Sequence, residues 1–220
     1  MSSTKRGRER NRKDNYPTPK WCVKRLLEEI GAELPEGMWC EPCAGDGAII
    51  MAVNEALPGA RLRWTAIEIR AEGVAKLKKL PMKLLVLHDN TLKIMKRVGP
   101  WEVIISNPPF SQAMEIIVEA MQHAKHVIML LRLNFLGSEE RAEFMRRTQP
   151  DIYVLPNRPS FFKKRVRNKK TGEISKTLRD VTDSIEYAWF HWWGGSSGRI
   201  RVLRSTPKIE RLTGRRRQAS

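Results

Sequence analysis

Short apolar runs alternate along this chain with longer stretches whose apolar residues recur at helical spacing. The short runs are rich in β-branched residues and end at polar, glycine or proline positions, which is typical of buried strands. They predict seven strands, at residues 38–41, 62–67, 84–87, 103–106, 127–131, 152–155 and 185–193. The stretches between them predict helices, at residues 19–30, from 48 to before Pro58, and at 71–80, 113–125 and 138–149.

Strands that alternate with helices indicate βαβ units and a mostly parallel sheet. The last two strands are separated by a segment without helical spacing, so the last strand is expected to be antiparallel. The pattern predicts a Rossmann-like α/β fold, and 220 residues are enough for one such domain with a sizeable core. At the first helix, Thr18 is expected as N-cap and Pro19 as the first helical residue.

Basic residues dominate the charge of the chain, which is +17 at pH 7 with a pI near 10.2. Such an excess favours a polyanionic partner. It concentrates in segments with little apolar content, so we expect a disordered basic arm at residues 1–13, a basic loop at 163–179 and a basic tail at 194–220. The domain itself is expected to span residues 14–193.

Apolar segments and cysteines exclude other classes of protein. No apolar run is long enough for a membrane span, and the N-terminus has no apolar core of a secretory signal, so a cytoplasmic protein is expected. Cys22, Cys40 and Cys43 are too few for a disulfide framework. Cys40 and Cys43 form a C-x-x-C without a second ligand cluster, so packing is favoured over a metal, and no metal is expected.

Polar residues cluster where the predicted parallel strands end, which is where open α/β sheets bind ligands. A glycine turn, residues 41–47, follows the first strand, and its glycines allow a ligand to approach the backbone closely. Glu68 ends the second strand and could accept hydrogen bonds from ribose hydroxyls; Asp89 ends the third and could accept from an adenine amine. Each also has a simpler interpretation, a tight turn or a solvated strand-end acid.

The order of several short segments resembles the N6-adenine DNA methyltransferases, particularly the small phage and prophage type. The core segments are Asp14-Asn15-Tyr16-Pro17-Thr18-Pro19, Glu41-Pro42-Cys43-Ala44-Gly45-Asp46-Gly47 and Asn107-Pro108-Pro109-Phe110. Arg158-Pro159-Ser160-Phe161 and Asp183-Ser184-Ile185-Glu186-Tyr187-Ala188-Trp189-Phe190 resemble further segments of that type. The resemblance covers roughly residues 14–193. It departs from the family at Glu41 and Cys43, where Asp and an aromatic residue are common.

The resemblance implies S-adenosylmethionine as cofactor and the N6 amine of adenine in DNA as methyl acceptor. It assigns the methionine part of the cofactor to Tyr16, Thr18 and Pro19, the cofactor turn to Glu41, Pro42, Cys43, Ala44, Gly45, Asp46 and Gly47, the ribose to Glu68, and the adenine to Asp89 and Asn90. The catalytic residues are expected to be Asn107, Pro108, Pro109 and Phe110. Arg158, Ser160 and Phe161 are expected to contact the extruded base; core packing is the alternative for Phe161.

The catalytic tetrapeptide suits the chemistry that the resemblance implies. An exocyclic amine is a poor nucleophile, because its lone pair is delocalised into the ring. The side-chain oxygen of Asn107 and the carbonyl of Pro108 can accept its hydrogens and stabilise the developing positive charge. The prolines hold that carbonyl in place, and Phe110 offers a flat face to a base.

The substrate class stays open between several alternatives. Lys163, Lys164 and Arg165 begin the basic loop, and phosphate contacts are expected of them, with a solvated loop as the alternative. Few residues remain for a target-recognition domain, which predicts short or relaxed sequence specificity. RNA adenine methylation and a non-catalytic nucleic-acid-binding protein on the same fold are the alternatives. Protein glutamine methylation is disfavoured, because Phe110 stands where that family usually has Tyr.

Overall fold

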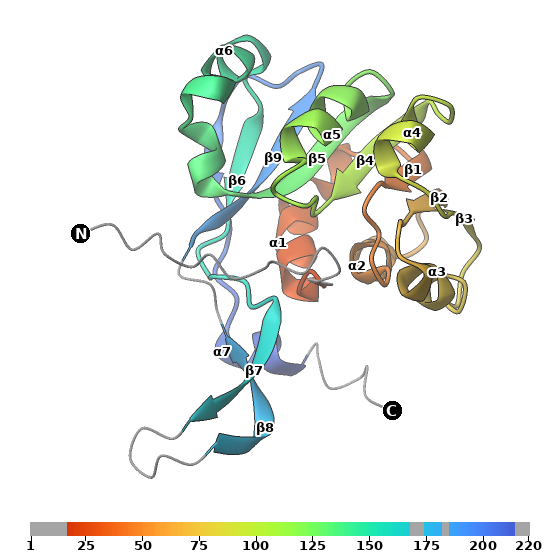
Figure 1. Cartoon of the computed structure of the whole chain (residues 1–220). Helices are drawn as coiled ribbons and strands as arrows, with labels where there is room; N and C mark the ends of the chain where they lie inside the picture. Colours follow the sequence, from red (N-terminus) through yellow and green to blue (C-terminus); the bar gives the residue numbers. More distant parts are fainter. Residues whose placement is uncertain (1–16, 168–173, 182–184, 214–220) are drawn as a thin grey trace.

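A computed structural model describes residues 17–167, 174–181 and 185–213, with only the backbone described at residues 162–167, 174–181 and 212–213. The arm predicted at residues 1–13, and Tyr16, lie outside these residues. Figure 1 shows an α/β domain with one large sheet between helices, and a separate small sheet that stands away from it.

The large sheet has eight strands in the order β10-β6-β9-β5-β4-β1-β2-β3. All neighbours are parallel except β9, which is antiparallel to both β5 and β6. Its strands are β1 (Gly37–Glu41), β2 (Leu62–Ile67), β3 (Leu84–Leu87), β4 (Trp101–Ser106), β5 (Ala124–Arg132), β6 (Asp151–Val154), β9 (Tyr187–Trp193) and β10 (Ile200–Val202). The predicted α/β class and the antiparallel last long strand are therefore confirmed.

Helices cover both faces of this sheet (Figure 1). The described helices are α1 (Lys20–Ile30), α2 (Ala48–Ala56), α3 (Ala71–Leu77), α4 (Thr91–Met95), α5 (Ala113–Ala120), α6 (Glu139–Thr148), α7 (Lys208–Thr213) and the short 3₁₀ turns η1 (Gly31–Glu33) and η2 (Leu133–Leu136). Residues of α1, α2 and α3 pack into one buried cluster, and residues of α4, α5 and α6 pack into a second one on the other face.

Successive side chains of the central strands pack alternately into these two clusters. On β4, Val103 and Ile105 belong to the cluster with α1 and α2, while Ile104 belongs to the cluster with α5. All three are fully buried. A strand that is covered on both faces needs apolar residues at every position, which explains the unbroken apolar run in the sequence.

The sheet has eight strands where the sequence predicts seven. The additional strand, β10, lies in the segment predicted as a basic tail and extends the sheet beyond β6. It has three residues, and its Ile200 and Val202 are 63% and 70% exposed. So short an edge strand, flanked by polar residues, has too little apolar periodicity to be recognised from its sequence.

The segment after β10 is also tied to the domain, in contrast to the predicted tail. Arg25 of α1 is buried, and its guanidinium donates to Thr206 Oγ1 at 2.9 Å and to Glu210 Oε2 of α7 at 2.6 Å. Lys24 also donates to Glu210, at 2.7 Å. These contacts join residues about 180 positions apart in the chain, so no local pattern of the sequence predicts them.

The basic loop predicted at residues 163–179 contains two strands instead. β7 (Phe162–Arg167) and β8 (Ile174–Val181) pair antiparallel in a sheet of their own, with Lys164 opposite Arg179 and a register shift between Arg165 and Arg167. An antiparallel pair can form without a hydrophobic face when its backbone hydrogen bonds and cross-strand pairs hold it. A loop was expected because the sequence of this segment is strongly polar, and polar, charged segments are usually loops.

Candidate active site

Five parallel strands, β1 to β5, place their carboxyl ends along one edge of the sheet. The glycine turn follows β1, Glu68 follows β2 and Asn107 follows β4. Since β1 lies between β2 and β4, these three segments are neighbours in space (Figure 1). The structure thus brings together the elements that the sequence places at strand ends.

The glycine turn depends on two residues with positive φ. Gly45 has φ 59° and Gly47 has φ 82°, a left-handed conformation that costs little only for glycine. A Cβ atom at Gly47 would also lie 2.6 Å from Cδ1 of Leu80. Gly47 is the N-cap of α2, so that helix begins directly after the turn.

Glu68 is a buried carboxylate at the centre of this edge. Its Oε2 accepts the Gly45 amide at 2.7 Å, and its Oε1 accepts the amide and the Nε of Arg70, both at 2.8 Å. Gly73 of α3 packs against it: a Cβ there would lie 2.6 Å from the Gly45 carbonyl oxygen and 2.7 Å from Glu68 Cγ. Helix α3, the turn and Glu68 are therefore fitted closely to one another.

Burial changes the acid–base properties of the first residue of the turn and of its cysteine. Glu41 is 2% exposed, and desolvation, followed by repulsion from Asp46 and Glu68, raises its pKa well above the usual range, although the Ile50 amide hydrogen bond opposes this. No donor in the described part of the chain reaches Glu41 Oε2. Burial raises the pKa of Cys43 to about 12, so its thiol stays protonated at neutral pH.

The two residues expected to hold the adenine, Asp89 and Asn90, accept hydrogen bonds from nearby backbone amides. Asp89 is half-buried, and its Oδ1 accepts the amide of Asn90 at 2.6 Å. Asn90 is the N-cap of α4, and its side-chain oxygen accepts the amides of Leu92 and Lys93 at 3.0 and 3.4 Å. The side-chain oxygen of Asn90 thus has a structural role, which the sequence pattern did not reveal because α4 was not predicted.

Asn107 is bound through its side chain to the segment that precedes α1. Its Nδ2 donates to Thr18 Oγ1 at 3.1 Å. The expectation that Thr18 caps α1 is therefore wrong: Pro19 is the N-cap, without a side-chain cap, and the buried Thr18 hydroxyl faces Asn107 instead. With Nδ2 directed at Thr18, the Oδ1 atom of Asn107 is directed away from it and can accept from a ligand.

The residues after Asn107 differ in exposure. Pro108 is buried, and no donor within the described residues reaches its carbonyl, whereas the Pro109 carbonyl accepts the Gln112 amide at 2.9 Å. Phe110 is 38% exposed, and the guanidinium of Arg132, at the end of β5, lies 4.4 Å from its ring centre. Sequence reasoning missed Arg132, although its place at the end of a strand beside β4 was available as a signal.

The segment that follows β6 approaches this site through aromatic rings. Phe161 packs edge-on against Tyr187, with ring centres 5.1 Å apart. The ring centre of Tyr187 lies 6.1 Å from that of Phe110. Phe161 and Ser160 are 8% exposed, so Phe161 fits the core-packing alternative. Arg158 is half-exposed and donates from Nε to Glu186 at 3.0 Å. For Lys163, Lys164 and Arg165, only the backbone in β7 is described.

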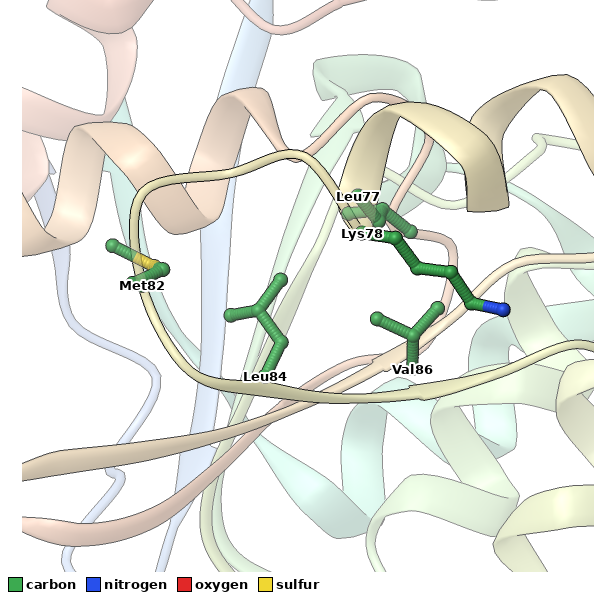
Figure 2. A pocket seen from close by; sticks show the side chains of 5 residues that line it. All are labelled: Leu77, Lys78, Met82, Leu84 and Val86. Atoms are coloured by element: carbon green, nitrogen blue, oxygen red, sulfur yellow. The ribbon is translucent and has the colours of Figure 1, made fainter.

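A hollow of about 320 Å³ lies elsewhere, between α3 and the edge strand β3 (Figure 2). It is lined by Leu77, Lys78, Met82, Leu84 and Val86. Four apolar side chains and one ammonium group offer no acceptor for an amine, so this hollow does not extend the site around Asn107. The described residues contain no group of three or more His, Cys, Asp and Glu that could hold a metal, and no helix among them is long and apolar enough to cross a membrane.

The large sheet is parallel apart from β9, which lies antiparallel between β5 and β6, and a glycine turn follows β1 and an acid follows β2, as in a Rossmann-like α/β fold. Solved structures share this fold. A candidate class I S-adenosylmethionine-dependent methyltransferase of Listeria monocytogenes superposes with a TM-score of 0.59 at 15% identity, over 94% of this chain and 71% of that one.

Two proteins of restriction-modification systems are also similar. The methyltransferase subunit of a type I system from Streptococcus thermophilus has a TM-score of 0.58 at 11% identity, and covers 89% of this chain. The modification subunit of a candidate type I restriction enzyme from Vibrio vulnificus has a TM-score of 0.57 at 13% identity, and covers 85%. The chain spans 50% and 46% of the length of these two proteins. No protein-family model and no curated protein matches the chain.

Proposed function

We propose that this chain is an S-adenosylmethionine-dependent methyltransferase that methylates the N6 amine of adenine in DNA. The observation that carries the proposal is the pair of acceptors at Asn107 and Pro108, held beside the glycine turn. Thr18 orients the Asn107 amide, and Pro108 keeps its carbonyl available. An amine with two hydrogens donates two hydrogen bonds, so it requires two acceptors that are fixed close together.

The glycine turn fits the cofactor in two respects. The buried Oε2 of Glu41 has no donor within the described residues, and the ammonium group of a methionine moiety would supply one. Gly45, with φ 59°, places no side chain on the turn, so a nucleoside can approach its backbone closely. In this proposal Glu68, at the end of β2, would accept the ribose hydroxyls, and Asp89, at the end of β3, would accept from the adenine amine.

The residues of this chain would supply positioning and electrostatic stabilisation. When bound, the cofactor supplies an electrophilic methyl group on its sulfonium. Asn107 Oδ1 and the Pro108 carbonyl would accept hydrogen bonds from the two amine hydrogens, direct the nitrogen lone pair at that methyl and stabilise the positive charge that develops on nitrogen, until the methylated nitrogen loses one proton to water. Phe110 is exposed enough for its ring to stack against a base.

DNA as substrate is supported by charge and by similarity. The net charge of +17 suits a polyanion, and β7 and β8 carry a large share of it in a hairpin outside the main sheet (Figure 1). Two proteins with this fold are named as subunits of type I restriction or restriction-modification enzymes. We infer that the hairpin contacts the phosphates of DNA and that Asn107 contacts an adenine extruded from it.

The test is transfer of a radiolabelled methyl group to DNA, RNA and total protein offered in parallel. Label that appears in DNA with the unchanged protein, and is absent with Asn107→Ala, is the expected result. Label in RNA alone would make the RNA enzyme the correct assignment. Binding to DNA without any transfer would support the non-catalytic alternative and contradict the proposal.

The hairpin has its own test, which does not depend on catalysis. Replacing Lys163, Lys164 and Arg165 together with Ala should weaken DNA binding at every sequence alike. The slope of log affinity against log salt should flatten by roughly 0.7–0.9 for each phosphate that the variant no longer neutralises. The matched control replaces three basic residues outside the hairpin, Lys76, Lys78 and Lys79, with Ala. This variant should change both the DNA affinity and the salt slope less.

A further inference from the structure

The carboxylate of Glu68 has no acceptor position left for a ribose. A carboxylate offers about four lone-pair sites. Oε1 receives the amide and the Nε of Arg70, both at 2.8 Å. Oε2 receives the Gly45 amide at 2.7 Å and the Nη2 of Arg70 at 3.4 Å. Two of these four donors belong to one guanidinium group, and the other two belong to the backbone.

The carboxylate itself cannot move away to make room. Gly73 packs so closely behind it that a Cβ there would lie 2.7 Å from Glu68 Cγ and 3.0 Å from Cδ. Its side chain is 5% exposed, and the Gly45 amide anchors it to the glycine turn. The Arg70 side chain is 22% exposed, so it has a path to solvent. Of the two partners, the guanidinium is the one that can leave.

We propose that the Arg70 guanidinium competes with the ribose hydroxyls of the cofactor for Glu68, and that Arg70 thereby lowers cofactor affinity. The inference rests on the proposed function, since it requires a nucleoside at Glu68. A ribose diol has two O–H donors, which replace Nε and Nη2 one for one. The backbone amides of Gly45 and Arg70 keep their places. Each binding event therefore breaks an ion pair within the protein.

This competition predicts the sign of a mutational effect that a binding residue would not show. Removing the guanidinium by Arg70→Ala leaves the backbone amide in place and frees two acceptor sites. The dissociation constant for S-adenosylhomocysteine, measured by calorimetry, should fall about three- to tenfold, the range for a partly exposed ion pair. An unchanged or a raised dissociation constant would overturn the proposal.

Two controls separate competition from the loss of a positive charge. Arg61 precedes the amino end of β2 and pairs with Glu36 at 2.8 Å, so Arg61→Ala removes the same charge at the opposite end of the same strand. Its dissociation constant should not change. In a Glu68→Gln background, Arg70→Ala should lose its effect; an equal tightening there would mean long-range electrostatics and would also overturn the proposal.

The experiment distinguishes this inference from the proposed function. If the unchanged protein and Arg70→Ala both fail to bind S-adenosylhomocysteine and S-adenosylmethionine, the proposed function fails and the competition fails with it. If the unchanged protein binds and Arg70→Ala binds no more tightly, only the competition fails. Thermal unfolding without ligand checks that Arg70→Ala is folded; a weakened affinity of the folded variant then contradicts the competition.

Discussion

The two halves of the carboxyl edge differ in how their polar groups are partnered. In the cofactor half, which comprises the glycine turn, Glu68 and Gly73, the Glu68 carboxylate is buried, and Arg70 and Gly45 occupy its lone pairs. In the amine half, which comprises Thr18 and Asn107 to Phe110, one hydrogen bond orients Asn107, and the Pro108 carbonyl has no donor in the described part of the chain.

This difference separates two ways of building a site. The Glu68 carboxylate in the cofactor half is held by contacts within the protein, so a ligand must replace its existing partners, and affinity depends on that exchange. Acceptors in the amine half are fixed in position but left available, so they can act on charge that develops during a reaction. Substitutions in the two halves should accordingly change different quantities, binding in one and rate in the other.

The largest expected effect is on rate, in the amine half. Asn107→Ala should lower single-turnover methyl transfer by at least about a hundredfold, because it removes an acceptor that matters most as the amine becomes cationic. Cofactor affinity should change little. Asn134→Ala, which changes an exposed residue of η2 just after β5, is the matched control and should keep its rate. A rate within a few fold of the unchanged protein would exclude Asn107 as the catalytic acceptor.

The next effect is on binding, in the cofactor half. Glu68→Ala should weaken S-adenosylhomocysteine binding by about 1–3 kcal/mol, because it removes both a charged acceptor for the ribose and the anchor of the Gly45 amide. Calorimetry measures this directly. Glu72→Ala removes an exposed acid from α3 and should leave affinity unchanged. Equal effects of the two variants would contradict the ribose assignment.

Glu41 should show opposite effects on stability and affinity. Its folded-state pKa lies above the unfolded value near 4.5, so the folded protein binds more protons and loses stability as pH rises above that value. At pH 8, Glu41→Gln should therefore raise the free energy of unfolding measured in urea by on the order of 1–2 kcal/mol over the unchanged protein, and at pH 4 by less. Its cofactor affinity should fall if Oε2 accepts an ammonium. Destabilisation at pH 8 would show that the buried carboxylate has a partner that Gln cannot replace.

The smallest effect returns to the amine half. Thr18→Val preserves the shape of the side chain and removes the oxygen that orients Asn107. Transfer rate should fall about two- to tenfold, the equivalent of one hydrogen bond of about 0.5–1.5 kcal/mol. Because Thr18 is buried, a thermal melt should accompany the kinetics. A change in melting temperature with an unchanged rate would place Thr18 in packing alone.

Most of the sheet and the cofactor half could be predicted from the sequence, because their signals are local. The strand at residues 62–67 and the glycines at 45 and 47 have patterns that extend over a few adjacent residues. The features that were missed depend on residues far apart in the chain. The contact between Asn107 and Thr18 spans 89 positions, and that between Arg25 and Thr206 spans 181.

Weak local signals explain the other differences. β10 has three residues at a sheet edge, and β7 and β8 are polar strands whose pairing no apolar alternation marks. Arg70 lies two positions after Glu68, within reach of sequence reasoning, but an arginine after a strand resembles an ordinary solvated residue. Its two side-chain hydrogen bonds to that acid become evident only in three dimensions.

We propose that the acceptors at Asn107 and Pro108 direct methyl transfer to adenine N6 in DNA. The most direct measurement is mass spectrometry of nucleosides from DNA that has been incubated with the protein and isotopically labelled S-adenosylmethionine. Labelled N6-methyldeoxyadenosine should form with the unchanged protein and should not form with Asn107→Ala. Labelled methylcytosine, or no labelled nucleoside from DNA while RNA or protein is labelled, would contradict it.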